Sequence, residues 1–133
     1  MLKLATIARL TLAAALLVPG VAQAENWEKF VESESGVIFW IDRDSIGNSG
    51  QYRKAWTMAD YTNVPGDEVG RRKALEEYDC GAWSLRPVRI EAYGRNGTLL
   101  RSVDIAPGEA EWQKAGPGSI AEAKLELVCP KRN

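Results

Sequence analysis

Histidine is absent from this chain of 133 residues, and cysteine occurs only twice, at Cys80 and Cys129. Without histidine, the Ser-His-Asp and Cys-His catalytic arrangements are excluded, and zinc and copper lose their usual imidazole ligand. Two cysteines also fall short of the four ligands of a structural zinc site. The sequence therefore predicts no metal and no cofactor, and we expect the protein not to be an enzyme.

Phosphate-binding glycine motifs and the acidic loop of EF-hand calcium sites are missing as well. Carboxylates are the catalytic option that remains, because a pair of acids can act across a cleft. Glu91, Asp104 and Glu111 are the candidates for such a pair. Since 18 acidic residues crowd this short chain, we interpret these three as solvated surface charge.

Residues 1–24 have the pattern of a secretory signal peptide. A basic start is followed by an apolar stretch and by an Ala-Gln-Ala tripeptide at 22–24, which is a small-x-small cleavage site. The apolar stretch is shorter than the ~20 residues that span a bilayer. We predict cleavage between Ala24 and Glu25, which leaves residues 25–133 as a single domain. No cysteine lies beside the cleavage site, so we expect a periplasmic, secreted or cell-surface protein without a lipid anchor.

The predicted mature chain carries 15 basic and 18 acidic residues, a net charge of about −3. Nucleic acids and anionic membranes attract clustered positive charge, so this balance argues against both as partners. After the leader, no apolar stretch is long enough to cross a bilayer. We expect neither a nucleic-acid partner nor an integral membrane segment after cleavage.

Short β-branched, aromatic and alternating segments predict an antiparallel sheet. Asn96-Gly97 marks a hairpin turn, because both residues tolerate positive φ. One segment, 71–80, also suits a helix by its composition, and we favour a strand there because Tyr78 and Cys80 fit one. The predicted strands are 37–41, 52–61, 71–80, 85–93 and 98–105.

One helix is predicted near the C-terminus, where Ser119 and Glu122 form a capping box. Its apolar stripe ends at Cys129, so this cysteine lies on the buried face, with Lys124 and Glu126 off the stripe. We predict a disulfide from Cys80 to Cys129 that tethers the helix to the sheet in an α+β fold. Closing a loop of about 50 residues contributes roughly 4 kcal/mol in the chain-entropy model. The stripe comprises Ala121, Leu125, Val128 and Cys129.

A fixed order of aromatic, turn and cysteine residues spans nearly the whole mature chain: Trp27, Trp56, Asp60-Tyr61, Cys80, Trp112, Pro117-Gly118-Ser119 and Cys129. This order resembles the surface-adhesin protein E-like family of Gram-negative envelope proteins. The resemblance implies an antiparallel sheet with a disulfide-held C-terminal helix. It also implies a homodimer and the binding of host extracellular proteins such as vitronectin, laminin and plasminogen. The namesake adhesin is a lipoprotein, whereas the lipidation cysteine is missing here.

Tryptophan is the residue type that best suggests a binding surface, and most of the five tryptophans are expected in the core of a small β protein. Trp83, in a Gly-Ala-Trp turn just after Cys80, is the one we expect to be exposed and to contact a ligand. Arg71, Arg72 and Lys73 form a second candidate contact patch, for which a solvated charged face is the alternative.

The sequence therefore favours an exported, non-catalytic envelope protein that binds a macromolecule, either a protein or a glycan. The alternatives are a small periplasmic enzyme, an inhibitor of an exported hydrolase such as lysozyme, and a purely structural envelope protein. A pocket with two buried acids would favour the enzyme, whereas a flat aromatic patch would favour binding. A surface without any apolar patch above a few hundred Å² would favour the structural role.

Overall fold

A single antiparallel sheet forms most of this protein, whose computed structural model describes residues 25–131. The predicted signal peptide lies outside the described residues. The main strands follow the order β1-β2-β4-β5-β6-β7, while β3 pairs with β4 and β8 pairs with β6. The strands are β1 (Trp27–Glu32), β2 (Ile38–Asp42), β3 (Gly47–Ser49), β4 (Tyr52–Asp60), β5 (Val69–Asp79), β6 (Ser84–Gly94), β7 (Leu99–Asp104) and β8 (Gln113–Lys114).

The five predicted strands are all present, with ends that differ by one or two residues. The ambiguous segment 71–80 forms β5 up to Asp79, because its residues pair with β4 on one side and with β6 on the other. The turn at Asn96-Gly97 joins β6 to β7, with φ of 86° at the glycine. The short strands β1, β3 and β8 are additions that the sequence pattern did not predict.

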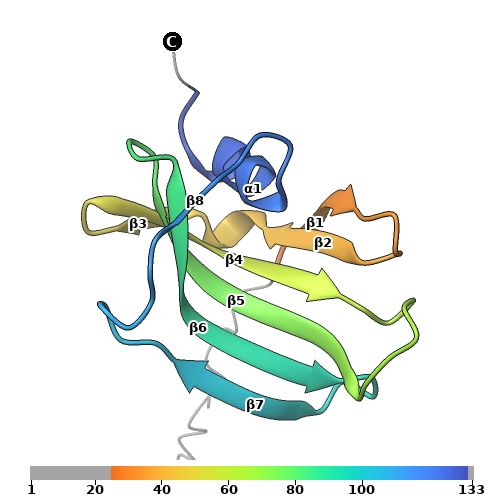
Figure 1. Ribbon diagram of the computed structural model, residues 1–133. Helices are drawn as coiled ribbons and strands as arrows, with labels where there is room; N and C mark the ends of the chain where they lie inside the picture. The colour runs from red at the N-terminus through yellow and green to blue at the C-terminus, as the bar shows by residue number, and fades with distance from the viewer. Residues whose placement is uncertain (1–24, 132–133) are drawn as a thin grey trace, which may run out of the picture.

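The C-terminal helix α1 (Ile120–Val128) covers one side of the sheet and confirms the predicted α+β architecture (Figure 1). Its N-terminus is capped by Ser119 Oγ, which accepts a hydrogen bond from the Glu122 N–H at 3.1 Å. Leu125 and Val128 are buried against a core that includes Ile41 and Tyr78. These contacts position the helix across the end of the sheet near β1 and the start of β6.

The predicted disulfide between Cys80 and Cys129 is present and joins residues separated by 49 positions in the chain. Cys129 directly follows α1, and Cys80 directly follows β5. Both cysteines belong to or border the buried cluster beneath the helix. The bond therefore fixes the helix to the sheet at the same place where the apolar stripe packs.

Lys124 corrects one detail of the predicted helix, because its side chain faces the sheet. Its Nζ lies 2.9 Å from Glu76 Oε1, and the two side chains are only 15% and 7% exposed. The Glu76 carboxylate also accepts hydrogen bonds from the hydroxyls of Thr57 and Tyr78. Position 124 lies three residues after Ala121 and four before Val128, so it falls on the same face of the helix as these stripe residues. The long lysine stem then carries its charge to the carboxylate on β5.

Strand β6 extends past the helix and divides the sheet into a covered region and an open region. Leu85, near its start, packs in the core with Leu125, whereas Arg89 to Tyr93 pair with β7. Figure 1 shows β7 at the lower edge of the sheet, away from the helix. Among residues 25–131, the outer edge of β7 pairs with no other strand.

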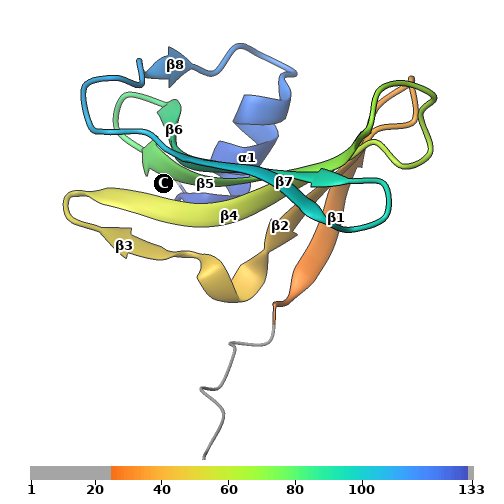
Figure 2. The same cartoon turned by 90° about the horizontal axis from the view of Figure 1, so that it is seen from below.

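The side of the sheet opposite the helix carries a short 3₁₀ turn, η1 (Arg43–Ser45), as Figure 2 shows. Ser45 fixes this turn, since its Oγ accepts a hydrogen bond from the Trp56 N–H at 2.8 Å and donates one to the Asp42 carbonyl at 2.7 Å. Residues 25–131 contain no helix with the length and apolar character that crossing a bilayer requires.

Candidate functional site

Apolar side chains are exposed together in the open region of the sheet. Among residues 25–131, every large apolar side chain classed as exposed lies on β6 or β7, with exposed fractions of 36% to 50%. Single exposed apolar residues are ordinary, but a contiguous group of them marks a candidate contact surface. The group comprises Ile90, Leu99, Leu100 and Val103.

A groove of about 530 Å³ runs along this part of the sheet. Arg101 pairs with Ala92 and Leu99 pairs with Tyr93, so Leu100 is the extra residue of a bulge. The bulge brings Leu100 beside Arg101, and both residues line the groove. We call this feature the β6–β7 groove, and its lining comprises Glu68, Val69, Arg72, Ile90, Ala92, Leu100, Arg101 and Val103.

Two arginines give the β6–β7 groove a positive character. Within the described residues, the side chains of Arg72 and Arg101 form no hydrogen bond and no ion pair, and both residues are exposed. Glu68 is the single acidic residue of the lining. An apolar floor flanked by two cations without partners suits a ligand that brings both apolar and acidic groups.

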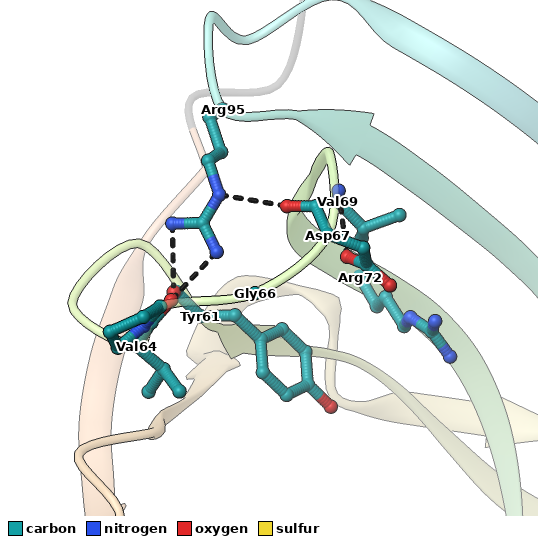
Figure 3. Close-up of a pocket in the computed structure, with 8 residues that line it drawn as sticks. Tyr61, Val64, Gly66, Asp67, Val69, Arg72 and Arg95 are labelled. Atoms are coloured by element: carbon teal, nitrogen blue, oxygen red, sulfur yellow. Dashed lines mark hydrogen bonds between the residues drawn. The ribbon is translucent and has the colours of Figure 1, made fainter.

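A smaller hollow of about 260 Å³ adjoins the groove and shares Val69 and Arg72 with it. Figure 3 shows Arg95, from the β6–β7 turn, reaching over the β4–β5 loop. Its guanidinium donates hydrogen bonds to the carbonyls of Asp67 and Val64, at 2.9 and 2.7 Å. With two longer bonds from Nη1 to the carbonyls of Tyr61 and Thr62, these contacts hold the loop beside the groove, so we interpret Arg95 as a positioning residue.

Gly70 permits this close approach between β5 and the β6–β7 turn. A Cβ atom at this position would lie 2.9 Å from the Arg95 Cα, closer than carbon atoms pack. The absence of a side chain at Gly70 thus lets the Arg95 N–H donate to the Glu68 carbonyl at 3.1 Å. Backbone contacts between the start of β5 and the β6–β7 turn therefore form this end of the groove.

On the opposite side of the sheet, which carries η1, two cations lie against aromatic rings. Lys73 Nζ lies 5.3 Å from the centroid of the Trp27 ring and 5.1 Å from that of Tyr93. Arg86 lies 4.4 Å from the centroid of Trp112, and it also pairs with Glu77 at 3.0 Å. Cation–π contact and ion pairing satisfy these charges within the protein.

The carboxylate of Glu25 joins this arrangement at the start of the described chain. The Trp27 indole donates a hydrogen bond to it at 2.7 Å, and Lys73 Nζ lies 3.4 Å away. The hydrogen bond from Trp27, with a smaller contribution from the charge of Lys73, lowers the pKa of Glu25, against the opposing effect of partial burial. Nearby, partial burial and then the hydrogen bond to Glu91 raise the pKa of the Tyr93 hydroxyl.

The residues of the predicted contact surface do not lie together. Alternation along β5 directs Arg72 into the β6–β7 groove and Lys73 to the opposite side, against Trp27 and Tyr93. Arg71 pairs with Asp60 at 3.3 Å. Trp83 is partly buried, packs against the core and has a φ of 55° in the β5–β6 turn. Of the four candidates, Arg72 alone lines the groove, and a contact role for the other three stays a prediction.

Two of the three acids considered for catalysis pair with the same cation. Arg89 lies between two of them, with Nη1 at 2.7 Å from Asp104 and Nη2 at 3.2 Å from Glu91. Glu111 is exposed in the β7–β8 connection. This geometry forms an ion-pair network and does not place the acids across a cleft from each other.

Sequence reasoning missed the groove, although a signal for it exists. Leu99, Leu100 and Val103 lie in a predicted strand whose apolar residues break strict alternation. Adjacent leucines in a short strand indicate either burial on both faces or a bulge. Which of the two applies depends on whether another element covers the strand, and that is decided by which strands the helix packs against.

The fold and the groove together define a class of protein: a one-sheet domain with a disulfide-tethered C-terminal helix and one open, uncovered end. A model of the surface-adhesin protein E family matches residues 27–130. The chain belongs to this family of adhesin-like envelope proteins. A comparison with curated proteins finds no significant match.

Proposed function

We propose that this protein is exported by cleavage between Ala24 and Glu25 and acts without catalysis, by binding an extracellular protein through the β6–β7 groove. The observation that carries the proposal is that three exposed apolar side chains, those of Ile90, Leu100 and Val103, line the same groove as two unpaired arginines. A protein ligand is favoured over a glycan, because the groove lining contains no aromatic ring on which a sugar could stack. Its mixture of apolar contacts and arginine is typical of protein interfaces.

Membership of an adhesin family supports a host extracellular protein as the ligand. The two other classes considered for this chain receive less support. Of the three acids that were candidates for catalysis, Glu91 and Asp104 pair with Arg89, and Glu111 is exposed. Glu91 also lines a hollow of about 250 Å³ with Glu25 and Asp42, but of these three acids only Asp42 is buried. A purely structural role gives no reason for an open groove at the end of the sheet. A homodimer, which the resemblance implies, stays a prediction.

Location is tested by treating intact cells with a protease that does not enter them. Surface display predicts loss of the protein from intact cells, with a periplasmic marker protein left whole. Full protection of the protein in intact cells, with digestion after the outer membrane is permeabilised, would restrict it to the periplasm and remove host contact from the proposal.

Binding is tested with the purified mature chain on immobilised vitronectin, laminin and plasminogen, measured by surface plasmon resonance. The groove variant combines Arg101→Glu with Val103→Asp, and we expect it to lose binding about 100-fold or more, as hot-spot substitutions do. The control combines Lys54→Glu with Gln51→Asp, which makes the same change of net charge at two exposed positions outside the groove lining, and it should bind as the wild type does. Equal binding by the groove variant would contradict the proposal.

A further inference from the structure

The backbone of β7 presents unpaired hydrogen-bonding groups along the groove. The Ile105 N–H donates to the Val88 carbonyl at 2.9 Å, just beyond the end of β7. In an antiparallel ladder, alternate residues face the partner strand, so Val103 and Arg101 bond toward β6. The N–H and C=O groups of Ser102 and Asp104 therefore point away from the sheet, where no described strand lies.

This edge lacks most of the devices that keep sheet edges from pairing. Proteins usually protect an edge with proline, lysine, very short strands or a covering element. Strand β7 has six residues, all exposed, and contains neither proline nor lysine. The Leu100 bulge interrupts it only near its start. Ser102 and Asp104 are thus available to pair with an incoming extended segment.

The side chains beside this edge specify what such a segment would carry. Residues of an added strand alternate between the two sides of the sheet. Those on the groove side would contact Leu100, Arg101 and Val103 in turn. Apolar residues complement the first and last of these side chains, and an acidic residue between them complements Arg101. Arg72, across the groove, can contact the same acid or a second one.

A second copy of this chain complements the edge less well. Pairing of β7 with another β7 would bring Arg101 and Arg72 of the two copies to one surface, with Glu68 as the only acid in each lining. Like charges that face one another across strands oppose pairing. An acidic segment instead supplies the partner that both arginines lack.

We propose that the ligand binds by strand addition: an extended segment of a partner protein, with apolar residues flanking an acidic one, pairs with the outer edge of β7. Its backbone hydrogen-bonds to Ser102 and Asp104, and its groove-side residues contact Leu100, Arg101, Val103 and Arg72. The inference deepens the proposed function and rests on it for the identity of the surface, while it adds the conformation and charge of the ligand.

The probe is a short fluorescent peptide with the order Thr-Val-Thr-Glu-Thr-Val. In an extended strand its two valines and its glutamate lie on one side, and its threonines lie on the other. We expect it to bind the mature chain, measured by fluorescence anisotropy. A peptide with lysine in place of glutamate should bind at least about tenfold more weakly. A peptide with the same side chains but methylated backbone nitrogens on the pairing edge should lose binding by a similar factor or more, because it cannot donate to β7.

The matching protein variant is Ser102→Pro, which removes the outward N–H and leaves the groove lining unchanged. Proline is tolerated at an edge position whose N–H faces solvent. We expect at least tenfold weaker peptide binding by Ser102→Pro, with unchanged binding by the control Ser102→Ala. Hydrogen exchange provides a second readout, since the peptide should slow exchange of the Ser102 and Asp104 amides, and it does not depend on how well Ser102→Pro folds.

Three results would overturn strand addition. The first is equal binding of the methylated and unmethylated peptides, and the second is unchanged exchange at Ser102 and Asp104 under saturating peptide. The third is a wild-type dimer, detected by light scattering, that Ser102→Pro converts to monomer while the peptide does not bind.

If host proteins bind but do so equally to wild type and Ser102→Pro, the proposed function stands and the inference fails. If the peptide binds by these criteria and no host protein does, the inference stands and the adhesin role fails.

Discussion

On one side of the sheet, the region covered by the helix and the open region differ in whether their side chains are buried and paired. Beneath the helix, Leu125 is fully buried, and the Glu76 carboxylate receives Lys124 and two hydroxyls. Beyond the helix, Val103 is 43% exposed and Arg101 has no partner among the described residues. The first region satisfies its apolar and charged groups internally, whereas the second leaves apolar side chains exposed and an arginine without a partner among the described residues.

The disulfide is the strongest single constraint on the covered region, so we expect its removal to have the largest effect on stability. We expect Cys80→Ala with Cys129→Ala to lower the free energy of unfolding by about 4 kcal/mol, since the bond closes a long loop in the unfolded chain. Urea unfolding followed by tryptophan fluorescence measures the change. The groove does not contact the helix, so peptide binding to the remaining folded fraction should be unchanged. Loss of intrinsic peptide affinity would show that the two regions are coupled.

The buried ion pair between Lys124 and Glu76 has the next largest expected effect on stability. Lys124→Met leaves the Glu76 carboxylate buried with two hydroxyls but no cation, and we expect a loss of about 3 kcal/mol. The double variant Glu76→Gln with Lys124→Met removes the charge and keeps an acceptor for Thr57 and Tyr78. It should therefore lie within about 1 kcal/mol of the wild type. Equal destabilisation of the single and double variants would mean that the methionine packs poorly and that charge is not the cause.

This ion pair also shows where sequence reasoning reaches its limit. The strands, the capped helix and the disulfide follow from local signals, because alternation, caps and turn residues act over a few positions. Glu76 and Lys124 are 48 positions apart, and neither carries a local mark of burial. Their pairing follows from the depth at which the helix packs, which depends on the fitted shapes of Tyr78, Leu85 and Leu125.

The groove is a second example, with a different cause. The apolar residues at 99, 100 and 103 were visible in the sequence, and Arg72 was among the predicted contact residues. Alternation alone could have separated Arg72 from Arg71 and Lys73. What the sequence could not supply is where the helix packs, since its caps and apolar stripe fix its bounds but not which strands it covers.

Tyr78 gives the covered region a pH dependence. Burial, and then the neighbouring Glu76 charge, raises the pKa of its hydroxyl well above the usual value. Above about pH 10, the unfolded chain loses this proton while the folded chain keeps it, so stability falls as pH rises. The loss from this group approaches about 1.4 kcal/mol per pH unit. Tyr78→Phe should be less stable by about 1 kcal/mol at neutral pH and should show a shallower decline between about pH 9.5 and 11. Parallel pH profiles in urea unfolding would assign the alkaline loss to other groups.

The smallest effects are expected in the open region, and they bear most directly on its purpose. Val103→Thr and Arg101→Gln keep strand-compatible shapes at exposed positions, so each should change the free energy of unfolding by less than about 0.5 kcal/mol. Leu125→Ala, the reference in the covered region, should lose about 3 kcal/mol. A loss at Val103 comparable to that at Leu125 would place the groove within the folding core and remove the contrast. Neutral values throughout would show that folding does not require these side chains, which leaves this apolar, positively charged edge free for the contact with a ligand that we propose.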